Sequence, residues 1–286
     1  MPSENPVSIA IVGRGRIGAG LGLAWSRGGA SVTLLARSDG QTHGLPVIAN
    51  RTEWPRAIGT AACVVVATPD REIRGVAQGL AASHAVRARH VVLHTSGLLD
   101  RTALDPLATS AAALGSLHPL MAVARAVDAP GQLQGAFAGI EGDPAAMAMA
   151  SRLAALAGLT PVPIPSSAKA GYHAAAAMIS NYTVALYDAA RRVAEQNGVS
   201  PASAATIYLP LLRGTVANLE GQEPAAALTG AIRRGDVETV AAHLRAVRSD
   251  DLRRLYVELG KAALHLAREA GLDGATAERV AAVLEG

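Results

Sequence analysis

The segment Ser8-Ile9-Ala10-Ile11-Val12-Gly13-Arg14-Gly15-Arg16-Ile17-Gly18 is the clearest indication of the fold of this 286-residue chain. A mostly apolar run predicts a buried strand, and the pattern Gly-x-Gly-x-x-Gly follows it directly, at the start of a predicted helix. Gly13 permits a tight turn, Gly15 lets a pyrophosphate approach the backbone, and Gly18 lets the helix pack on the strand. The amides and positive dipole of the helix N-terminus favour phosphate binding. We therefore predict a dinucleotide site that includes Arg14, Arg16 and Ile17.

Outward from this motif, short β-rich runs alternate with helical segments over residues 1–165, which is typical of a parallel, doubly wound α/β sheet of the Rossmann type. The predicted strands are Ser8–Val12, Ser31–Ala36, Cys63–Ala67, Val91–His94, Ala113–Leu117, Phe137–Glu141 and Thr160–Ile164. The predicted helices between them include Arg16–Arg27, Arg71–Ser83 and Pro144–Leu156.

The pattern changes after residue 160. Pro161, Pro163 and Pro165 indicate a linker, and Ser166 or Ser167 would cap a new helix. From there to Gly286 only helices and turns are predicted. We expect a dinucleotide-binding domain over residues 1–165 and an all-helical domain over residues 166–286 for substrate binding and dimerisation.

The end of the second strand distinguishes NADP from NAD. An NAD site usually places Asp or Glu there to bind the ribose 2′-hydroxyl. This chain has Leu35-Ala36-Arg37-Ser38, with no acid before Asp39. The guanidinium of Arg37 and the hydroxyl of Ser38 suit a 2′-phosphate, and Arg14 adds charge nearby. The pattern favours NADP(H), although Arg37 is also explained as an exposed residue at a strand end.

Ligands of open α/β sheets bind at the carboxyl ends of the strands. Thr68 and Pro69 follow the third predicted strand, and we expect them to line the nicotinamide ribose. Asp70, next in the chain, is equally well explained as a helix N-cap. Thr95 occupies the same position after the strand Val91–His94 and carries the same two interpretations.

Composition excludes several classes of protein. The formal net charge is +3 with acids and bases interleaved, which is not a nucleic-acid-binding pattern. Cys63 is the only cysteine and lies in an apolar run, so it predicts a buried thiol and neither a disulfide nor a thiol metal site. No His, Asp or Glu cluster indicates a metal. The N-terminus has no signal-peptide pattern and no stretch suggests a membrane span, so we expect a cytoplasmic protein.

Three further segments carry a family resemblance. They are Gly115-Ser116-Leu117-His118-Pro119-Leu120, Tyr172-His173-Ala174-Ala175-Ala176 with Asn181 downstream, and Leu228-Thr229-Gly230 leading to Arg234-Gly235-Asp236. With the glycine motif they resemble two-domain proteins that join a Rossmann-like NADP-binding domain to a helical domain of unknown function. That family is similar in build to pyrroline-5-carboxylate reductases and deazaflavin-linked NADP oxidoreductases, and it includes an alternative class of ketopantoate reductase. This chain departs from its pattern at Ala231, where the family has proline, and at Arg233, where it has a small residue.

A polar stripe on the helix after the linker is the candidate for catalysis. Lys169, His173, Ala177 and Asn181 recur every four residues and would share one helix face. Polar groups with alanine between them are typical of a helix that lines a cleft. Against this, Lys169 in the first turn is also explained as solvated, and His173 as an interdomain histidine with its hydrogen bonds satisfied.

Other candidates lie outside this helix. His118, at a strand end, should face the same cleft, although a structural histidine explains it as well. Thr229 and Gly230 form a predicted turn, and Arg234 with Asp236 is explained by an ion pair and a helix cap; the resemblance implies that this turn reaches the substrate. The remaining histidines are expected at the surface: His43, His84, His90, His243 and His265.

The resemblance and these residues together imply an NADPH-dependent reductase of a C=O or C=N bond in a small carboxylate-bearing metabolite. His173 or Lys169 would donate the proton, with His118 as the alternative donor, and Asn181, Thr229 or Arg234 would orient the carboxylate. A ketopantoate-like 2-oxo acid is the first substrate that the resemblance implies, and a cyclic imine is the second. A non-catalytic NADP sensor is the rival from another class. We also expect a homodimer through the helical domain, because its Ala- and Leu-rich amphipathic helices leave apolar faces uncovered.

Overall fold

The computed structural model describes residues 6–38 and 42–286. Contacts divide the chain into two compact units, Met1–Ser180 and Asn181–Gly286. The helix that carries Lys169 therefore belongs to the first unit, fifteen residues beyond the boundary expected from the prolines. The reason is that Lys169 is buried at the edge of the sheet, as described below. None of the described helices is long and apolar enough to cross a membrane.

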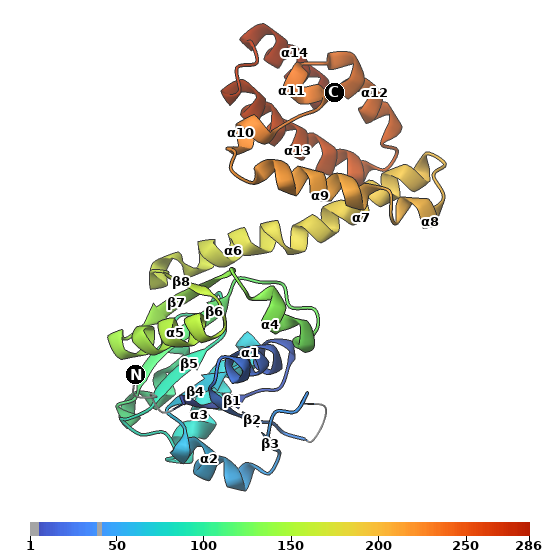
Figure 1. The fold of residues 1–286 in the computed structure, drawn as a ribbon. Helices are drawn as coiled ribbons and strands as arrows, with labels where there is room; N and C mark the ends of the chain where they lie inside the picture. The colour runs from blue at the N-terminus through green and yellow to red at the C-terminus, as the bar shows by residue number, and fades with distance from the viewer. Residues whose placement is uncertain (1–5, 39–41) are drawn as a thin grey trace. The chain divides into compact units, whose positions relative to one another are not determined.

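The first unit is built on an eight-stranded sheet in the order β3-β2-β1-β4-β5-β6-β7-β8 (Figure 1). The strands are β1 Ser8–Val12, β2 Ser31–Leu35, β3 Val47–Ile48, β4 Cys63–Val66, β5 Val91–His94, β6 Ala113–Pro119, β7 Phe137–Gly142 and β8 Thr160–Pro163. The predicted fold class is confirmed, with β1 and β4 as the neighbours at which the strand order reverses. Dinucleotides bind at such a reversal point.

Helices cover both faces of the sheet. The longer ones are α1 Arg16–Arg27, α2 Trp54–Thr60, α3 Asp70–Ala82, α5 Pro144–Leu156 and α6 Lys169–Ile179, and the short ones are α4 Ala129–Gln132 and the 3-10 segments Arg51–Glu53, Arg101–Ser110, Ala126–Asp128 and Ser166–Ala168. Successive side chains of β1 alternate between two cores: Ile9 and Ile11 pack with α1 and α5, whereas Ala10 and Val12 pack with α2 and α3. Burial on both faces is why the central strands β1, β4 and β5 are mostly apolar.

Several local predictions are corrected. Strand β7 runs antiparallel to β6, because the intervening segment 120–136 holds only short helices and no long crossover helix. Pro161 and Pro163 belong to β8, which pairs only with β7, so as an edge strand it tolerates proline.

Neither Ser166 nor Ser167 caps α6; the Ser166 hydroxyl donates to Glu141 instead. His90, expected at the surface, is 1% exposed, and its ring contacts the Ile58 carbonyl.

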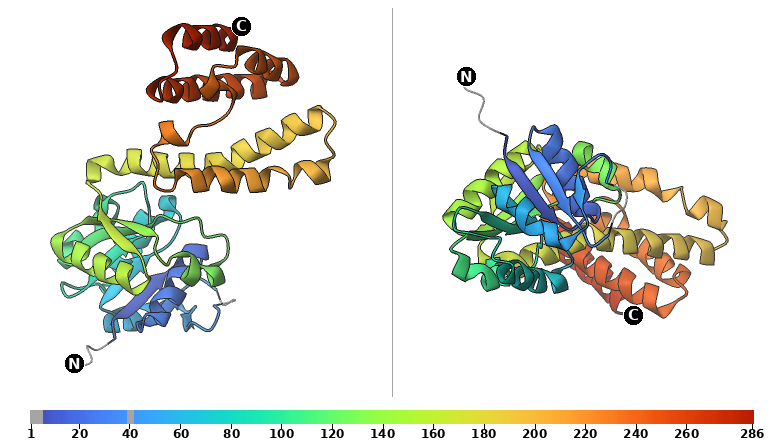
Figure 2. Two further views of the ribbon diagram at one scale, coloured as in Figure 1. Left: turned by 45° about the horizontal axis from the view of Figure 1, so that its top comes forward. Right: turned by 90° about the horizontal axis from the view of Figure 1, so that it is seen from below.

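The second unit is all helical, as predicted. Its helices are α7 Asn181–Gln196, α8 Pro201–Ala204, α9 Tyr208–Leu219, α10 Pro224–Ala227, α11 Ala231–Arg234, α12 Val237–Ala246, α13 Asp250–Glu269 and α14 Gly274–Glu285. A small core joins α12, α13 and α14 through side chains such as Val240, Leu264 and Val280. Asp236 accepts from the Thr239 amide and so begins α12, as predicted. In two views of this unit α7 and α9 lie side by side (Figures 1 and 2).

Candidate functional site

The glycine loop between β1 and α1 has the geometry that a pyrophosphate requires. Gly13 has φ +113°, and a Cβ there would lie 2.5 Å from the Ala67 carbonyl oxygen. A Cβ on Gly18 would collide with the carbonyl oxygen of Gly13. Gly15 differs, because its backbone is extended and a Cβ there would meet nothing within 4 Å. Gly13 and Gly18 are thus required by the fold, whereas Gly15 leaves open space at the N-terminus of α1.

The neighbouring strand end fits the same group. Thr68 follows β4, and its methyl carbon would contact a Cβ on Gly13. Its hydroxyl oxygen is buried without a hydrogen-bond partner among the described residues. No acid lies in the first turn of α1. An open backbone cradle, an unpartnered hydroxyl and a positive helix end fit a dinucleotide pyrophosphate held at the loop from Gly13 to Gly18.

Two arginines meet the end of β2. The Arg14 guanidinium donates to the Ser38 hydroxyl over 3.1 Å, which ties the glycine loop to the segment after β2. Arg37 is 75% exposed and pairs loosely with Glu72 at 3.7 Å. The strand ends at Leu35, one residue earlier than predicted. Asp39 lies outside the described residues. Arg14 thus contacts Ser38, and Arg37 directly precedes Ser38 in the chain. Both predicted cations therefore lie near the end of β2.

A buried lysine connects α6 to the ends of two strands. Lys169 is 3% exposed, and its ammonium donates to the Ser116 hydroxyl over 2.8 Å and to the Ser96 carbonyl over 3.2 Å. Burial lowers its pKa, and the charges of Glu141, Asp100 and Asp70 oppose that shift. Lys169 is therefore not the solvated first-turn residue that one interpretation of the sequence expected.

Residues that sequence reasoning missed complete this network. Glu141, 5% exposed, accepts from the hydroxyls of Ser116 and Ser166. Ser96 donates to Asp70 over 2.8 Å, so Asp70 binds this serine and is not the cap of α3. The only sequence signal was an acid inside the otherwise apolar strand Phe137–Gly142, since the partners of Glu141 are distant in the chain.

Two histidines and a tyrosine converge on Gly97, after β5. A Cβ on Gly97 would lie 2.5 Å from Nδ1 of His173 and 2.9 Å from Nε2 of His118. The rings of His118 and His173 meet edge to face at 5.6 Å. Tyr172 places its hydroxyl 3.0 Å from Nδ1 of His118. The predicted candidates His118 and His173 are thus brought together with Tyr172.

The two histidines differ in access. Nδ1 of His173 is buried and has no hydrogen-bond partner among the residues that the structure describes. Nε2 of His118 makes no hydrogen bond among the described residues, yet it is not sealed from solvent. Burial, followed by the charges of His173 and Lys169, lowers the pKa of His118 to about 4. His118 is therefore neutral near pH 7.

The other predicted site residues lie as follows. Pro69 is the residue before α3, and Thr95 is half-buried and pairs its amide with the Val66 carbonyl. Asn181 does not share the helix of Lys169, because α6 ends at Ile179 and α7 begins at Asn181. That part of the predicted stripe is wrong.

The turn around residue 230 belongs to the second unit. Thr229 and Gly230 are exposed between α10 and α11, and Gly230 has φ +92°. Arg234 is 66% exposed and lies 4.0 Å from Asp236. At Arg233 the pattern of the resembled family has a small residue. In this chain the Arg233 guanidinium donates to the Ala270 carbonyl at the end of α13.

Comparisons with solved structures match both units. A protein from Thermotoga maritima matches with a TM-score of 0.69 at 23% identity, over 91% of this chain and 98% of that chain. The Plasmodium falciparum pyrroline carboxylate reductase with NADP bound has a TM-score of 0.62 at 11% identity, over 97% and 99%. An imine reductase from Pseudomonas sp. has a TM-score of 0.59 at 17% identity, over 98% and 93%. Among curated proteins, no sequence matches this chain.

Two domain families match the sequence itself. The first is the family of Rossmann-like domains, which matches residues 3–119. The second is a domain of unknown function (DUF2520), over residues 136–263. The chain is therefore a two-domain protein in which a Rossmann-like domain is followed by a DUF2520 domain, the pairing that the sequence resemblance implied.

Proposed function

We propose that this chain is an NADPH-dependent reductase of a C=N or C=O bond in a small carboxylate-bearing metabolite. The observation that carries the proposal is the pairing of two features on neighbouring strand ends. One is the open cradle at Gly15 beside the unpartnered Thr68 hydroxyl, and the other is the cluster of His118, Tyr172 and His173 at Gly97. The reduced nicotinamide supplies a hydride when the cofactor is bound.

The side chains that would hold the cofactor follow from the geometry. The amides of the loop after Gly13 would hold the pyrophosphate, since the Gly13 amide itself donates to the Leu35 carbonyl, and Thr68, Pro69 and Thr95 would line the adjoining strand ends. Arg37, Ser38 and Arg14 provide the donors for a 2′-phosphate. This arrangement supports NADPH over NADH.

His118 is the best-placed group for the proton. Lys169 has its ammonium engaged by Ser96 and Ser116, and Nδ1 of His173 is sealed. Nε2 of His118 lies beside Gly97 and has no hydrogen-bond partner among the described residues. We therefore assign substrate contact to His118, and to Lys169 the role of fastening α6 to the sheet.

The state of His118 favours one substrate class. A neutral imidazole with a pKa of about 4 is a good hydrogen-bond donor but a weak acid. A ketone needs a proton as its oxygen becomes an alkoxide, whereas an imine can arrive already protonated. This protonation state favours a cyclic imine over the ketopantoate-like 2-oxo acid expected first from the sequence. The carboxylate contacts assigned to Asn181, Thr229 and Arg234 stay predictions.

The test is NADPH oxidation, followed at constant enzyme concentration against a panel of carboxylate-bearing cyclic imines and 2-oxo acids. Turnover of an imine supports the proposal, and turnover of 2-oxo acids alone would reverse the order of substrates. Binding of NADPH without turnover of any panel member would favour the sensor. Gly15→Val supplies the matched variant: its side chain enters open space, so the fold is retained while the pyrophosphate is excluded. Unchanged NADPH affinity in this variant would contradict the cofactor assignment.

A further inference from the structure

A carboxylate lies beside the residues proposed to bind the 2′-phosphate. The guanidinium of Arg37, after β2, meets the carboxylate of Glu72, in α3, at 3.7 Å. Strands β2 and β4 flank β1 in the sheet, and α3 follows β4, so this ion pair joins residues from the two sides of the glycine loop. Arg14, in that loop, donates to Ser38, next to Arg37. The pair therefore lies at the strand ends along which the adenosine half of a dinucleotide would bind.

Glu72 has a structural explanation as well. It lies in the first turn of α3, where a negative charge interacts favourably with the helix dipole, and Asp70 lies in the same turn. That interaction does not require Arg37. The two side chains of the pair are 75% exposed for Arg37 and 33% exposed for Glu72, so solvent and a ligand can both reach the pair. An exposed pair of this length adds little to stability, and a ligand can therefore exchange it at little cost.

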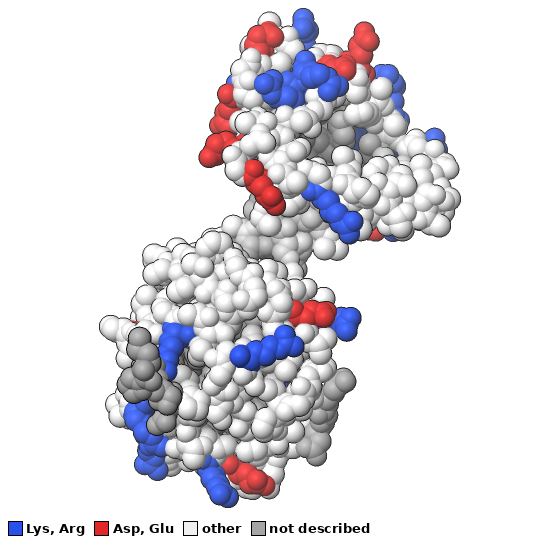
Figure 3. Space-filling model, viewed as in Figure 1, with Lys and Arg blue, Asp and Glu red and all other residues white. Residues whose placement is uncertain are grey.

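Single charges near the strand ends decide phosphate selectivity, because the chain has no strong overall field. Its formal net charge is only +3. On the face that Figure 3 shows, the described Lys and Arg side chains of the first unit lie scattered among uncharged ones. The charge of one carboxylate next to Arg37 is therefore a large part of the local electrostatic balance.

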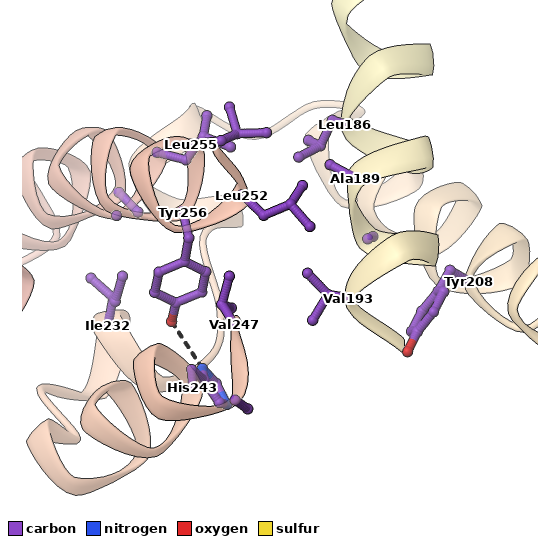
Figure 4. A pocket seen from close by; sticks show the side chains of 15 residues that line it. Leu186, Ala189, Val193, Tyr208, Ile232, His243, Val247, Leu252, Leu255 and Tyr256 are labelled. Carbon is purple, nitrogen blue, oxygen red and sulfur yellow. Dashed lines mark hydrogen bonds between the residues drawn. The ribbon is translucent and has the colours of Figure 1, made fainter. Parts of the chain in front are cut away.

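The cavity of the second unit offers no comparable group. About 480 Å³ in volume, it is lined by α7, α12 and α13, with Tyr208 of α9 at its edge (Figure 4). Among its lining residues, His243 and Tyr256 are hydrogen bonded to each other over 2.9 Å. None of the described residues that line it is a Lys, Arg, Asp or Glu. A phosphate would find no fixed counter-charge there, so its selective recognition depends on the first unit.

We propose that Glu72 is a specificity-determining residue that limits the preference for NADPH over NADH. Its carboxylate competes with the 2′-phosphate for Arg37 and repels that phosphate, which carries a charge of about −2 near pH 7. NADH has no 2′-phosphate, and its pyrophosphate is common to both cofactors, so Glu72 acts on the ratio of the two affinities. The inference rests on the proposed cofactor and not on the substrate that is reduced.

Isothermal titration of NADPH and NADH at low ionic strength tests the proposal. Glu72→Gln keeps the size of the side chain and removes its charge. We expect it to tighten NADPH binding about 3- to 10-fold, the effect of removing one negative charge about 7 Å from a phosphate, and to leave NADH binding unchanged. Asp105→Asn is the matched control, because Asp105 is an exposed acid that pairs with Arg101 at 3.8 Å after β5. It should leave both affinities unchanged.

A second titration separates this inference from the proposed reaction. Adenosine 2′,5′-bisphosphate and AMP lack the nicotinamide, and Glu72→Gln should tighten only the first of them. The gain should shrink at about 1 M salt, where charges are screened within about 3 Å. Unchanged or weaker NADPH binding in Glu72→Gln, or equal tightening of NADPH and NADH, overturns the inference and leaves the cofactor assignment intact. A wild-type chain that binds neither cofactor overturns both, whereas absence of turnover bears on the reaction alone.

Discussion

The hydroxyl of Tyr172 lies 3.0 Å from Nδ1 of His118, and this contact determines which nitrogen of the imidazole carries the hydrogen. Burial raises the pKa of the Tyr172 phenol, and a hydrogen bond from the Gly139 backbone opposes this rise, which is the effect of an amide that donates to the phenol oxygen. We therefore infer that the phenol hydrogen is donated to Nδ1 of His118 and that the ring hydrogen is on Nε2, beside Gly97.

Tyr172→Phe should therefore lower kcat about 3- to 10-fold, the value of one hydrogen bond, with little change in NADPH affinity. Nitrogen-15 NMR of the histidines should show His118 losing its Nε2–H tautomer preference. A tautomer unchanged in Tyr172→Phe would contradict the role of Tyr172, even if the chain proves to be an active reductase.

His118→Ala should lower turnover by about 10²-fold if its Nε2–H contacts the reacting atom. His173→Ala removes a ring whose Nδ1 is sealed, so we expect a smaller loss. NADPH affinity, measured by fluorescence titration, should change little in either variant. The reverse order of losses would return the donor role to His173, as the sequence first suggested.

The sequence predicted the elements that local patterns specify and missed those made by distant contacts. Strands β1 and β5 and helices α1 and α5 have the predicted bounds, because apolar runs and glycine positions mark them directly. Lys169 was singled out by helical spacing, but its burial depends on Ser96 and Ser116, which no local pattern connects to it. The same applies to Glu141.

The break after α6 shows the limit of periodicity. A four-residue repeat placed Asn181 on the helix of Lys169 and His173, yet Ser180 ends that helix with ψ −71°. The prolines predicted a linker where the structure has a strand, because Pro161 and Pro163 are compatible with an edge strand as well as with a linker. For these prolines, the position of β8 at the edge of the sheet, which the local sequence does not encode, decides between a strand and a linker.

Stability should fall as the pH is lowered through a defined window. Burial lowers the pKa values of His94 and His118 from 6.5 to about 4. Their contribution is fully present above pH 6.5 and is lost as the pH falls towards 4, because the unfolded chain binds these protons first. The slope should approach about 1.4 kcal/mol per pH unit for each histidine.

Tryptophan fluorescence during denaturation checks this expectation, since both tryptophans, Trp25 and Trp54, lie in the first unit. In wild type, Nδ1 of His94 accepts from the Ser96 amide and Nε2 meets the Asp100 carbonyl. His94→Gln should roughly halve the pH slope. A stability that is flat between pH 6.5 and 4 would show that these histidines take up protons over the same pH range in the folded chain as in the unfolded chain.

Lys169→Met should destabilise the first unit by about 3 kcal/mol, because it leaves the Ser96 carbonyl and Ser116 hydroxyl without a donor and Glu141 without its nearby cation. Lys261→Met is the matched control. Lys261 is 48% exposed and pairs with Glu258 at the surface, so its loss should cost less than about 0.5 kcal/mol. Equal, small effects of the two changes would contradict the fastening role of Lys169.

Cofactor preference should rest on Arg37. Arg37→Asp should weaken NADPH binding by about 2–3 kcal/mol, the scale of a hydrogen bond to a charged group, and should weaken NADH binding less. Its wild-type ion pair with Glu72 is long and exposed, so losing it costs the fold little. Arg74→Asp makes the same change in charge at an exposed position of α3. It controls for the long-range electrostatic effect of that change and should weaken the binding of both cofactors only slightly. Isothermal titration of the four combinations gives the comparison. Equal losses for NADPH and NADH in Arg37→Asp would mean that Arg37 supports the strand end and does not read the 2′-phosphate.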